Sequence, residues 1–408
     1  MTVDFRPIEP DELYEFASVN LTAFGERLDP WHESWFQRRR EQSVTMAAFE
    51  TGQMVGSSMF FPVEVAVPGA VVTAAGVTAV GVLPTHRRQG VMRGMMDRLL
   101  LQAKESGLSM AALWASEGGI YSRFGFGPAA QSLRIDLEHP KASLVPAVRS
   151  GQMTLVSVEI ARRLFPPVHA QLVQQRPGMV GRDQIAWDYA LSDDDPLVPR
   201  EESHLFLLAH DSGDGCDGYL IYRIRGAWSP RGPEGTLLIT EMVGSSPRAT
   251  ADMWRYCTEV DLIRRIEASG RGCRPVDDPL LWLAQDPQAV VSTMRTTIWC
   301  RVLDPRALLE RRRYQRDGDL TLHLDPSLDE PGITWHLTVR DGVGSCQPSA
   351  GQADITMGWS DFGALCLGRR CLTQLVGAGR VRPHSPDIAR RAEELLAWEP
   401  QPWCFEDI

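Results

Sequence analysis

One stretch of the chain, residues 77–107, constrains its fold most, because the spacing of apolar residues changes within it. Val77–Val82 has the length and composition of a buried strand. From Val91 to Ala103, apolar side chains recur three and four residues apart, as on one face of a helix, and Gly107 is placed to end it. The loop between them, residues 83–90, carries two adjacent arginines and ends in glycine. A strand, a tight loop and a helix in this order predict an α/β unit.

The loop has the composition of an anion-binding site. A helix N-terminus offers free backbone N–H groups and the positive end of the helix dipole. Gly90 lets a ligand approach the backbone closely, and Arg87, Arg88 and Arg93 supply charge for a pyrophosphate. The alternative is an ordinary solvent-facing turn between strand and helix.

The rest of the chain shows the spacing of short strands and amphipathic helices. Strands are expected at residues 47–50, 54–61, 63–67, 71–73, 110–115, 205–209, 218–224, 236–243, 297–302, 320–324 and 334–340. Helices are expected at residues 10–23, 90–106, 247–261 and 386–398. The strand at 297–302 is assigned to a third structural unit that begins near Thr293.

Two motifs about thirty residues apart carry a family resemblance. The first is Pro84-Thr85-His86-Arg87-Arg88-Gln89-Gly90-Val91-Met92-Arg93, and the second is Ser116-Glu117-Gly118-Gly119-Ile120-Tyr121-Ser122-Arg123-Phe124-Gly125. Arg87 and Gly90 match the Arg/Gln-x-x-Gly-x-Gly/Ala loop of the GCN5-related N-acetyltransferases (GNAT), whereas Met92 departs from its last position. Both motifs together resemble the enhanced-intracellular-survival (Eis) family of actinobacterial acetyltransferases, which tolerates an apolar residue there.

The resemblance implies an α/β (α+β) fold made of three domains. Residues 1–148 would form a GNAT domain with the acetyl-CoA loop, and residues 149–292 a second, degenerate GNAT-like domain. The second lacks the loop because Gly244–Ala249 contains no Arg-x-x-Gly. Residues 293–408 would form a sterol-carrier-protein-like α/β domain, to which Trp335–Gly342 is similar, with a C-terminal tail entering the active site.

Acetyl-CoA is the co-substrate that the resemblance implies. At the matching positions its contacts would come from Val80, Gly81, Val82, Arg87, Arg88, Gln89, Gly90, Val91, Met92, Arg93, Ser116 and Glu117. The strand residues would present a backbone N–H to the thioester oxygen, as an oxyanion hole does.

Two residues take catalytic roles by the same resemblance. Tyr121 matches the proton donor, and a phenol with a pKa near 10 still holds its proton at neutral pH. The alternative for Tyr121 is a half-buried aromatic side chain in the core. The chain's own C-terminal carboxylate, on Ile408, matches the proton acceptor. Its ordinary pKa of about 3.3–3.7 is low for a base unless burial raises it.

The C-terminal tail supports that role through its composition. Trp403, Cys404 and Phe405 are too apolar for a frayed terminus, so we expect the tail to pack inward. A tail docked for stability alone is the alternative. Glu406 and Asp407 are rival bases or anchors for a cationic substrate, and Glu26 is a second candidate anchor.

Composition narrows the class of protein. With a net charge of −10, the chain suits cationic substrates and disfavours non-specific nucleic-acid binding. The long uncharged run Val65–His86 is broken by Pro and Gly, so it predicts strands rather than a membrane span. The start of the chain has no signal-peptide pattern and the eight cysteines have no C-x-x-C pair, which favour a cytoplasmic protein. The nine histidines lack metal-site spacing, so no metal is expected.

These observations lead to one functional hypothesis with two alternatives. The chain is expected to be an acetyl-CoA-dependent N-acetyltransferase of polycationic amines such as aminoglycosides, acting at several positions. The alternatives are a protein-lysine N-acetyltransferase and a non-catalytic lipid- or ligand-binding protein that uses the carrier-like domain. The resemblance also implies a homo-oligomer, a hexamer in the family.

Overall fold

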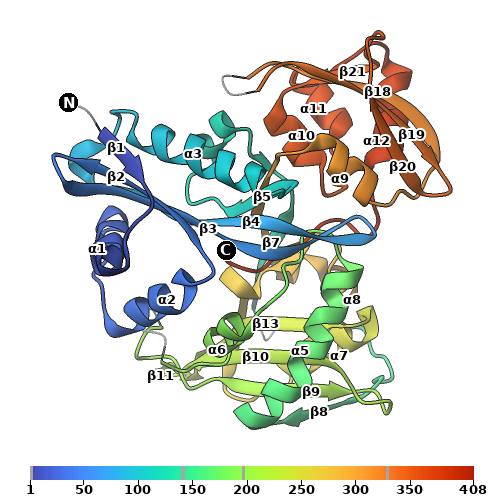
Figure 1. The fold of residues 1–408 in the computed structure, drawn as a ribbon. Coiled ribbons are helices and arrows are strands. Elements are labelled where there is room, and N and C mark those ends of the chain that lie inside the picture. The colour runs from blue at the N-terminus through green and yellow to red at the C-terminus, as the bar shows by residue number, and fades with distance from the viewer. Residues whose placement is uncertain (1–2, 139–142, 195–197, 328–329) are drawn as a thin grey trace. The chain divides into compact units, whose positions relative to one another are not determined.

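The computed structural model describes residues 3–138, 143–194, 198–327 and 330–408. The chain forms two compact units, each built from segments distant in the sequence (Figure 1). The first unit contains Met1–Ala129, Ile298–Glu399 and Ile408, and the second contains Ala130–Thr297 and Pro400–Asp407.

The first unit contains a seven-stranded sheet. Its strands, in spatial order, are β1 (Val3–Arg6), β2 (Val44–Glu50), β3 (Gln53–Val67), β4 (Ala70–Val82), β5 (Met110–Trp114), β17 (Ile298–Val302) and β6 (Gly127–Pro128). The helices of this part are α1 (Leu13–Phe24), α2 (Pro30–Arg40), α3 (Val91–Glu105) and α4 (Gly118–Tyr121). β4 and β5 run parallel, and the other neighbouring strands run antiparallel.

Alternation along the strands divides the helices between the two faces of this sheet. Ala47 and Phe49 of β2 pack with α1 and α2, whereas Met46 and Ala48 pack with α3. Successive strand residues point to opposite faces of the sheet. Ala47 and Phe49 therefore face the layer of α1 and α2, and Met46 and Ala48 face α3. Figure 1 shows α1 and α2 on one side of the strands and α3 on the other. The sheet is therefore buried on both faces where it supports the loop between β4 and α3.

Two expectations about strands in this unit are wrong. The separate strands expected on either side of Pro62, and those at 71–73 and 77–82, are two continuous strands, β3 and β4, paired from Val67↔Ala70 to Gly56↔Val82. The strand expected at 297–302 in the third unit is β17, which lies between β5 and β6 in the first sheet. β17 pairs with β5 and β6, which are distant in the sequence, so no local pattern of residues reveals its place in the sheet.

The remainder of the first unit is a five-stranded sheet with its own helices. The strands in spatial order are β20 (Val343–Pro348), β19 (Ile333–Arg340), β18 (Gly318–Leu324), β21 (Ile355–Met357) and β22 (Arg382–Pro383). The helices are α9 (Pro305–Arg311), α10 (Trp359–Leu365), α11 (Leu372–Gly377) and α12 (Pro386–Leu396). Arg312 is buried here and donates hydrogen bonds to the carbonyls of Cys366 and Leu396, at 3.2 and 2.6 Å. Both carbonyls lie where a helix ends, and the negative end of a helix dipole favours a cation.

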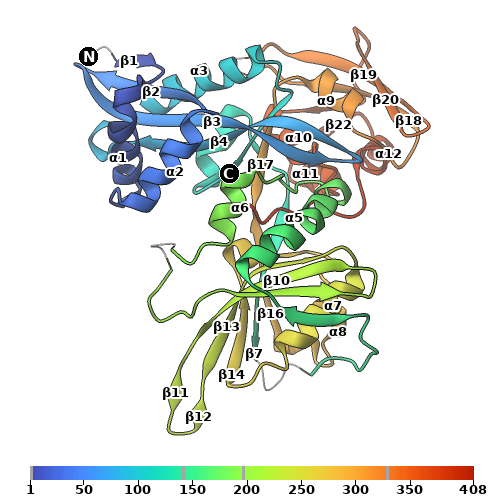
Figure 2. The same cartoon turned by 60° about the horizontal axis from the view of Figure 1, so that its bottom comes forward.

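The second unit is an eight-stranded sheet covered by helices. The path of strands is β15 (Arg274–Pro275), β7 (Gln131–Glu138), β14 (Ile263–Ala268), β13 (Gly235–Gly244), β10 (Cys216–Arg225), β9 (Phe206–Asp211) and β8 (Gln152–Leu155), with β16 (Val290–Thr296) also paired to β7. The helices are α5 (Val158–Gln175), α6 (Gln184–Ala190), α7 (Pro247–Cys257) and α8 (Leu280–Leu283). Figure 2 shows the ribbon of β11 (Trp228–Ser229) and β12 (Gly232–Pro233) projecting from the end of this sheet.

The two faces of this sheet are distinguished by neighbouring residues of β10. Tyr219 stacks on Phe165 of α5, with ring centroids 4.4 Å apart, whereas Leu220 belongs to the core that contains Trp254 of α7. The second unit thus repeats the plan of the first, with a strand, a loop and a helix (β13 to α7) beside a parallel neighbour, β14. The strands expected in this region are present, and α5 is a helix that the sequence analysis does not predict.

Candidate active site

A groove of about 920 Å³ opens in the first unit where β4 and β5 separate. These parallel strands are paired only at Ala75↔Ala111 and Gly76↔Ala112, and beyond that point they diverge. The groove is lined by Ala23, Phe24, Val80, Gly81, Val82, His86, Arg87, Arg88, Gly90, Val91, Met92, Arg93, Ser116, Glu117, Ile120, Tyr121, Arg123 and Phe124. All the residues expected to contact acetyl-CoA line it except Gln89, whose side-chain amide donates to the Thr85 carbonyl at 3.1 Å.

A β-bulge directs the end of β4 toward this groove. Ala79 and Val80 stand opposite a single residue of β3, because the pairing shifts between Ser57↔Gly81 and Met59↔Thr78. Ala79 takes a left-handed conformation with φ of +52°, and the Ser57 hydroxyl donates to its carbonyl at 3.0 Å. A bulge bends a strand and releases part of its ladder. Residues from Val80 onward are thereby available to the groove.

The loop before α3 presents the helix N-terminus to the same space. Gly90 is the N-cap, with φ of +85° and no side-chain cap. The first helical hydrogen bond of the backbone runs from Gly94 N–H to the Gly90 carbonyl at 3.0 Å, so the N–H groups of Val91, Met92 and Arg93 precede the helical ladder. Arg88 is also left-handed, with φ of +63°. Free N–H groups and a positive dipole at this end suit an anionic ligand.

The three arginines of this region divide between two tasks. Arg87 donates to the carbonyls of Ala23 and Val82, at 2.7 and 3.3 Å, and so ties the loop to the end of α1. Arg88 and Arg93 are exposed and line the groove. Arg87 is expected to contribute charge to a pyrophosphate. Its guanidinium also has a structural role, because its hydrogen bonds with Ala23 and Val82 hold the loop in shape.

Tyr121 lies at the groove on the short helix α4. Its side chain is buried, at 6% exposed, and its ring packs edge-to-face on Phe126 with centroids 6.1 Å apart. Burial raises the pKa of the Tyr121 phenol above its ordinary value, partly opposed by a hydrogen bond with the Ser116 side chain. A phenol in this setting keeps its proton at neutral pH and can donate it to an anion.

The C-terminal residue lies against β4. A Cβ placed on Gly76 would stand 2.8 Å from Ile408 Cγ2, so the Ile408 side chain packs on the strand at its last pairing with β5. Asp407 is assigned to the second unit. Desolvation by the surrounding protein raises the pKa of the Asp407 carboxyl, and the positive charge of Arg271 opposes this shift. Part of the residue is nevertheless exposed to solvent.

Glu26 lies in a smaller pocket of about 220 Å³ in the first unit. Its walls include Trp31 and Trp35, and the Glu26 carboxylate stands 3.9 Å from His32 Nε2. Phe24 lines both this pocket and the groove. An acidic group among aromatic rings suits a cation, because ring faces and carboxylates both attract positive charge.

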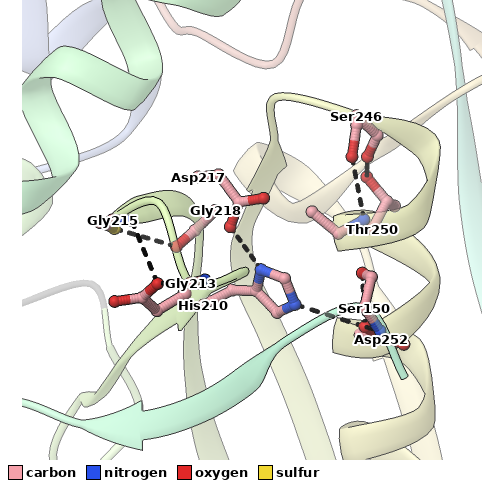
Figure 3. Close-up of polar contacts among 12 residues, drawn as sticks. Ser150, His210, Gly213, Gly215, Asp217, Gly218, Ser246, Thr250 and Asp252 are labelled. Atoms are coloured by element: carbon pink, nitrogen blue, oxygen red, sulfur yellow. Dashed lines mark hydrogen bonds and ion pairs between the residues drawn. The ribbon is translucent and has the colours of Figure 1, made fainter. Parts of the chain in front are cut away.

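A buried polar cluster in the second unit has no counterpart in the sequence analysis (Figure 3). His210 is fully buried, with Nδ1 2.5 Å from Asp217 Oδ1 and Nε2 3.4 Å from Asp252 Oδ2. The Ser150 hydroxyl donates to Asp252 at 2.7 Å rather than to His210. A nucleophilic serine needs the imidazole as its acceptor. The cluster therefore connects β9, β10 and α7 through hydrogen bonds and has a structural role. Figure 3 shows its side chains turned toward one another.

Within the described residues, no group of three or more His, Cys, Asp or Glu side chains could hold a metal ion. Among the helices of the described ranges, none is long and apolar enough to cross a membrane. All eight cysteines are free thiols, and all but Cys216 are buried.

Comparison with known proteins identifies the family. An acetyltransferase (GNAT) domain family matches residues 4–129, a second GNAT domain family matches 178–302, and a sterol carrier protein domain family matches 305–405. The chain is 32% identical to an uncharacterized N-acetyltransferase of Streptomyces griseus, over 99% of both chains. It is 31% identical to the N-acetyltransferase Eis of Mycobacterium bovis, over 85% of this chain and 83% of that one. The chain belongs to the Eis family of N-acetyltransferases.

Solved structures agree on the fold. The crystal structure of Eis1 from Mycobacterium abscessus covers 100% of both chains at 24% identity, with a TM-score of 0.81. A GCN5-related N-acetyltransferase from Anabaena variabilis covers 100% of both chains at 17% identity, with a TM-score of 0.84. The predicted Eis-like fold, two GNAT domains followed by a sterol-carrier-like domain, is confirmed. The chain is an N-acetyltransferase. The domain boundaries at 148 and 292 stay predictions.

Proposed function

We propose that this Eis-family enzyme transfers the acetyl group of acetyl-CoA to amines of polycationic small molecules, aminoglycosides among them, at one or several positions. The observation that carries the proposal is the groove of about 920 Å³, which joins the N-terminus of α3 to the buried Tyr121 phenol. A helix N-terminus with Arg88 and Arg93 suits a pyrophosphate, and a protonated phenol suits a thiolate leaving group.

The reaction follows from the roles of these groups. A substrate ammonium loses a proton, through water, to the C-terminal carboxylate of Ile408. The amine nitrogen then attacks the thioester carbon, and backbone N–H groups of Val80–Val82 stabilise the oxyanion of the tetrahedral intermediate. As that intermediate collapses, the C–N bond remains and the C–S bond breaks. Tyr121 gives its proton to the coenzyme A thiolate. The second proton on the attacking nitrogen leaves as the amide forms and passes through water to the tyrosinate, so Tyr121 is restored.

The pocket around Glu26 supports a cationic acceptor. Its carboxylate and the Trp31 and Trp35 side chains line a space that shares Phe24 with the groove. Each aromatic contact with a cation contributes about 0.5–2 kcal/mol, depending on desolvation. The net charge of −10 adds a longer-range attraction for polycations. We propose Glu26 as an anchor for a second ammonium of the substrate, and Asp407 as a further acidic contact.

The test compares two buried tyrosines in an assay of free-thiol release. Tyr121→Phe removes the proposed acid, whereas Tyr314→Phe removes another buried hydroxyl, which donates to the Leu309 carbonyl at 2.8 Å. Loss of a general acid lowers kcat by about 10²–10⁴-fold, so we expect that loss for Tyr121→Phe alone. Equal turnover for wild type and Tyr121→Phe, with an active wild-type enzyme, would exclude the proton-donor role.

A panel of acceptors separates the substrate classes. Aminoglycosides, simple polyamines and lysine-containing peptides are offered with acetyl-CoA, and acetylated products are counted by mass spectrometry. Turnover confined to peptides would favour the protein-lysine alternative. The family assignment already disfavours a protein that only binds a ligand. A homohexamer and a cytoplasmic location remain proposals from the family resemblance, and sedimentation velocity tests the first.

A further inference from the structure

The C-terminal tail is buried in the second unit as far as Glu406. Trp403, Cys404 and Phe405 are each no more than 3% exposed. Trp403 N–H donates to the Pro177 carbonyl at 2.9 Å, and the Ser132 hydroxyl of β7 donates to the Cys404 carbonyl at 3.2 Å. These contacts fix both the backbone and the side chains of a segment that would otherwise fray.

The approach of the tail to its neighbours requires a glycine. Gly178 has φ of +90°, and a Cβ on it would stand 2.8 Å from the Trp403 carbonyl oxygen. Any larger residue would push the tail away or strain the backbone. The path of the tail is therefore specified by residues more than 200 positions earlier in the sequence.

Glu406 is held by a buried ionic network. Its Oε1 lies 2.9 Å from His169 Nε2 and 2.8 Å from Arg182 Nη2. Arg182 also binds both carboxylate oxygens of Glu241, at 2.8 and 3.0 Å, and Arg271 forms a further ion pair with Glu241. The network thus contains two guanidinium groups and two carboxylates, with the His169 imidazole beside them. Burial disfavours the Glu406 carboxylate, but Arg182 and His169 outweigh it and lower its pKa to about 2.

This network occupies the place in the second unit that corresponds to the bulge of β4. In β13 the pairing with β10 shifts between Ile221↔Glu241 and Tyr222↔Ile239. The shift turns Glu241 onto the face covered by α5, toward Arg182. Beyond the bulge, Arg274 donates to the Met242 carbonyl. The second unit therefore uses its bulge to bind the tail, whereas the first uses its bulge to open a groove.

A buried ionic network of this kind fixes the position of its side chains more than it adds to the free energy of unfolding. Replacing a buried ion pair by well-packed apolar residues is often neutral or stabilising, so stability alone does not account for it. Two residues follow Glu406, and a fully extended chain advances about 3.3–3.6 Å per residue. The terminal carboxylate is therefore restricted to within roughly 10 Å of the Glu406 Cα atom. The chain re-enters the first unit at Ile408.

We propose that Glu406, held by His169 and Arg182, is a positioning residue that fixes the C-terminal carboxylate of Ile408 for proton abstraction. The inference rests on the proposed function, because it assigns the purpose of the anchor to that reaction. Glu406 itself is not the base, since its carboxylate is buried and engaged by two partners.

The test uses the full-length enzyme with Glu406→Gln, which keeps the size of the side chain and removes its charge. Glu202→Gln is the control, because Glu202 pairs with Arg225 at 2.8 Å in the same unit and belongs to no part of the network. We expect Glu406→Gln to lower kcat for amine acetylation at least tenfold while the KM for acetyl-CoA stays within twofold of wild type. A purely structural role would instead lower the fraction of folded enzyme, with kcat per acetyl-CoA-binding site unchanged, and that result would overturn the proposal.

A second measurement reports the anchor without reference to acetyl transfer. Carboxypeptidase A releases isoleucine from an accessible C-terminus, so wild type is expected to resist it and Glu406→Gln to lose Ile408 at least tenfold faster. Rapid release from folded wild type overturns the anchoring, even if Glu406→Gln fails to fold. If wild type resists carboxypeptidase but acetylates no amine, the proposed function fails while the anchor stands. His169→Gln, which retains a hydrogen-bond donor, is expected to give an intermediate rate of release, and a rate equal to wild type would remove His169 from the proposal.

Discussion

A matched pair of glycines tests the anion site at α3. Gly90 and Gly52 both have left-handed backbones, with φ of +85° and +83°, and a Cβ on either would meet no protein atom within 4 Å. Gly90 lines the groove, whereas Gly52 lies in the turn between β2 and β3. Alanine at each position incurs the same left-handed strain, about 1–2 kcal/mol. The reduced entropy of the unfolded chain offsets part of it, about 0.4–1 kcal/mol. We therefore expect both variants to lose about 1 kcal/mol of stability in urea unfolding.

The two variants should differ sharply in acetyl-CoA binding. A methyl group at Gly90 projects into the space next to the N–H groups of Val91 and Met92 and keeps a phosphate from approaching them. Loss of one charge-assisted hydrogen bond, about 1.5–3 kcal/mol, corresponds to roughly a tenfold to hundredfold weaker Kd. Isothermal titration calorimetry with acetyl-CoA measures this directly. The same Kd for Gly90→Ala and Gly52→Ala would refute the assignment of the groove to the pyrophosphate.

The remaining predictions concern the terminus, the acceptor pocket, acid stability and the carrier-like domain. One glycine added after Ile408 moves the carboxylate by about 3.6 Å, so kcat should fall at least tenfold with acetyl-CoA binding unchanged; full activity would remove that carboxylate from catalysis. Glu26→Gln should raise the KM for a polycationic amine several-fold but not that for acetyl-CoA, as steady-state kinetics would show, and an unchanged amine KM contradicts the anchor. The pKa of Glu406, about 2 in the folded chain, is below its unfolded value, so the stabilisation that its charge provides is present above pH 4.5 and lost as the pH falls toward 2. The difference in unfolding free energy between wild type and Glu406→Gln should therefore shrink over that range, and a constant difference would contradict it. Arg312→Met removes two hydrogen bonds from a charged group, so urea unfolding should show a loss of about 3–5 kcal/mol, and a loss below about 1 kcal/mol would show that the carbonyls find other donors.

The loop and helix around residues 83–105 could be predicted because their signal is local. The apolar spacing in Val91–Glu105 and the position of Gly90 determine the helix and its cap without reference to the rest of the chain. A motif on consecutive residues predicts Tyr121 as the proton donor. Its burial, which sets the protonation of the phenol, depends on contacts with Phe126 and its neighbours and became visible only in the fold.

The tail anchor could not be predicted, because its partners are distant in sequence. His169 and Glu406 are 237 residues apart, and no local periodicity marks either as part of a network. The one local signal was the apolar composition of residues 403–405, which indicated burial but not a partner. Likewise β17 joins the first sheet through pairing with β5, a contact that spans more than 180 residues. The continuity of β3 through Pro62 has a different cause, since an exposed proline is tolerated where its missing N–H is not needed.

We propose that only the first of the two GNAT domains binds acetyl-CoA, at the groove beside α3. Titration of the full-length chain with acetyl-CoA, by calorimetry, measures both affinity and the number of sites. We expect one site per chain, lost in a double variant with Arg88→Gln and Arg93→Gln. Two sites per chain, or one site that survives this double variant, would contradict the proposal.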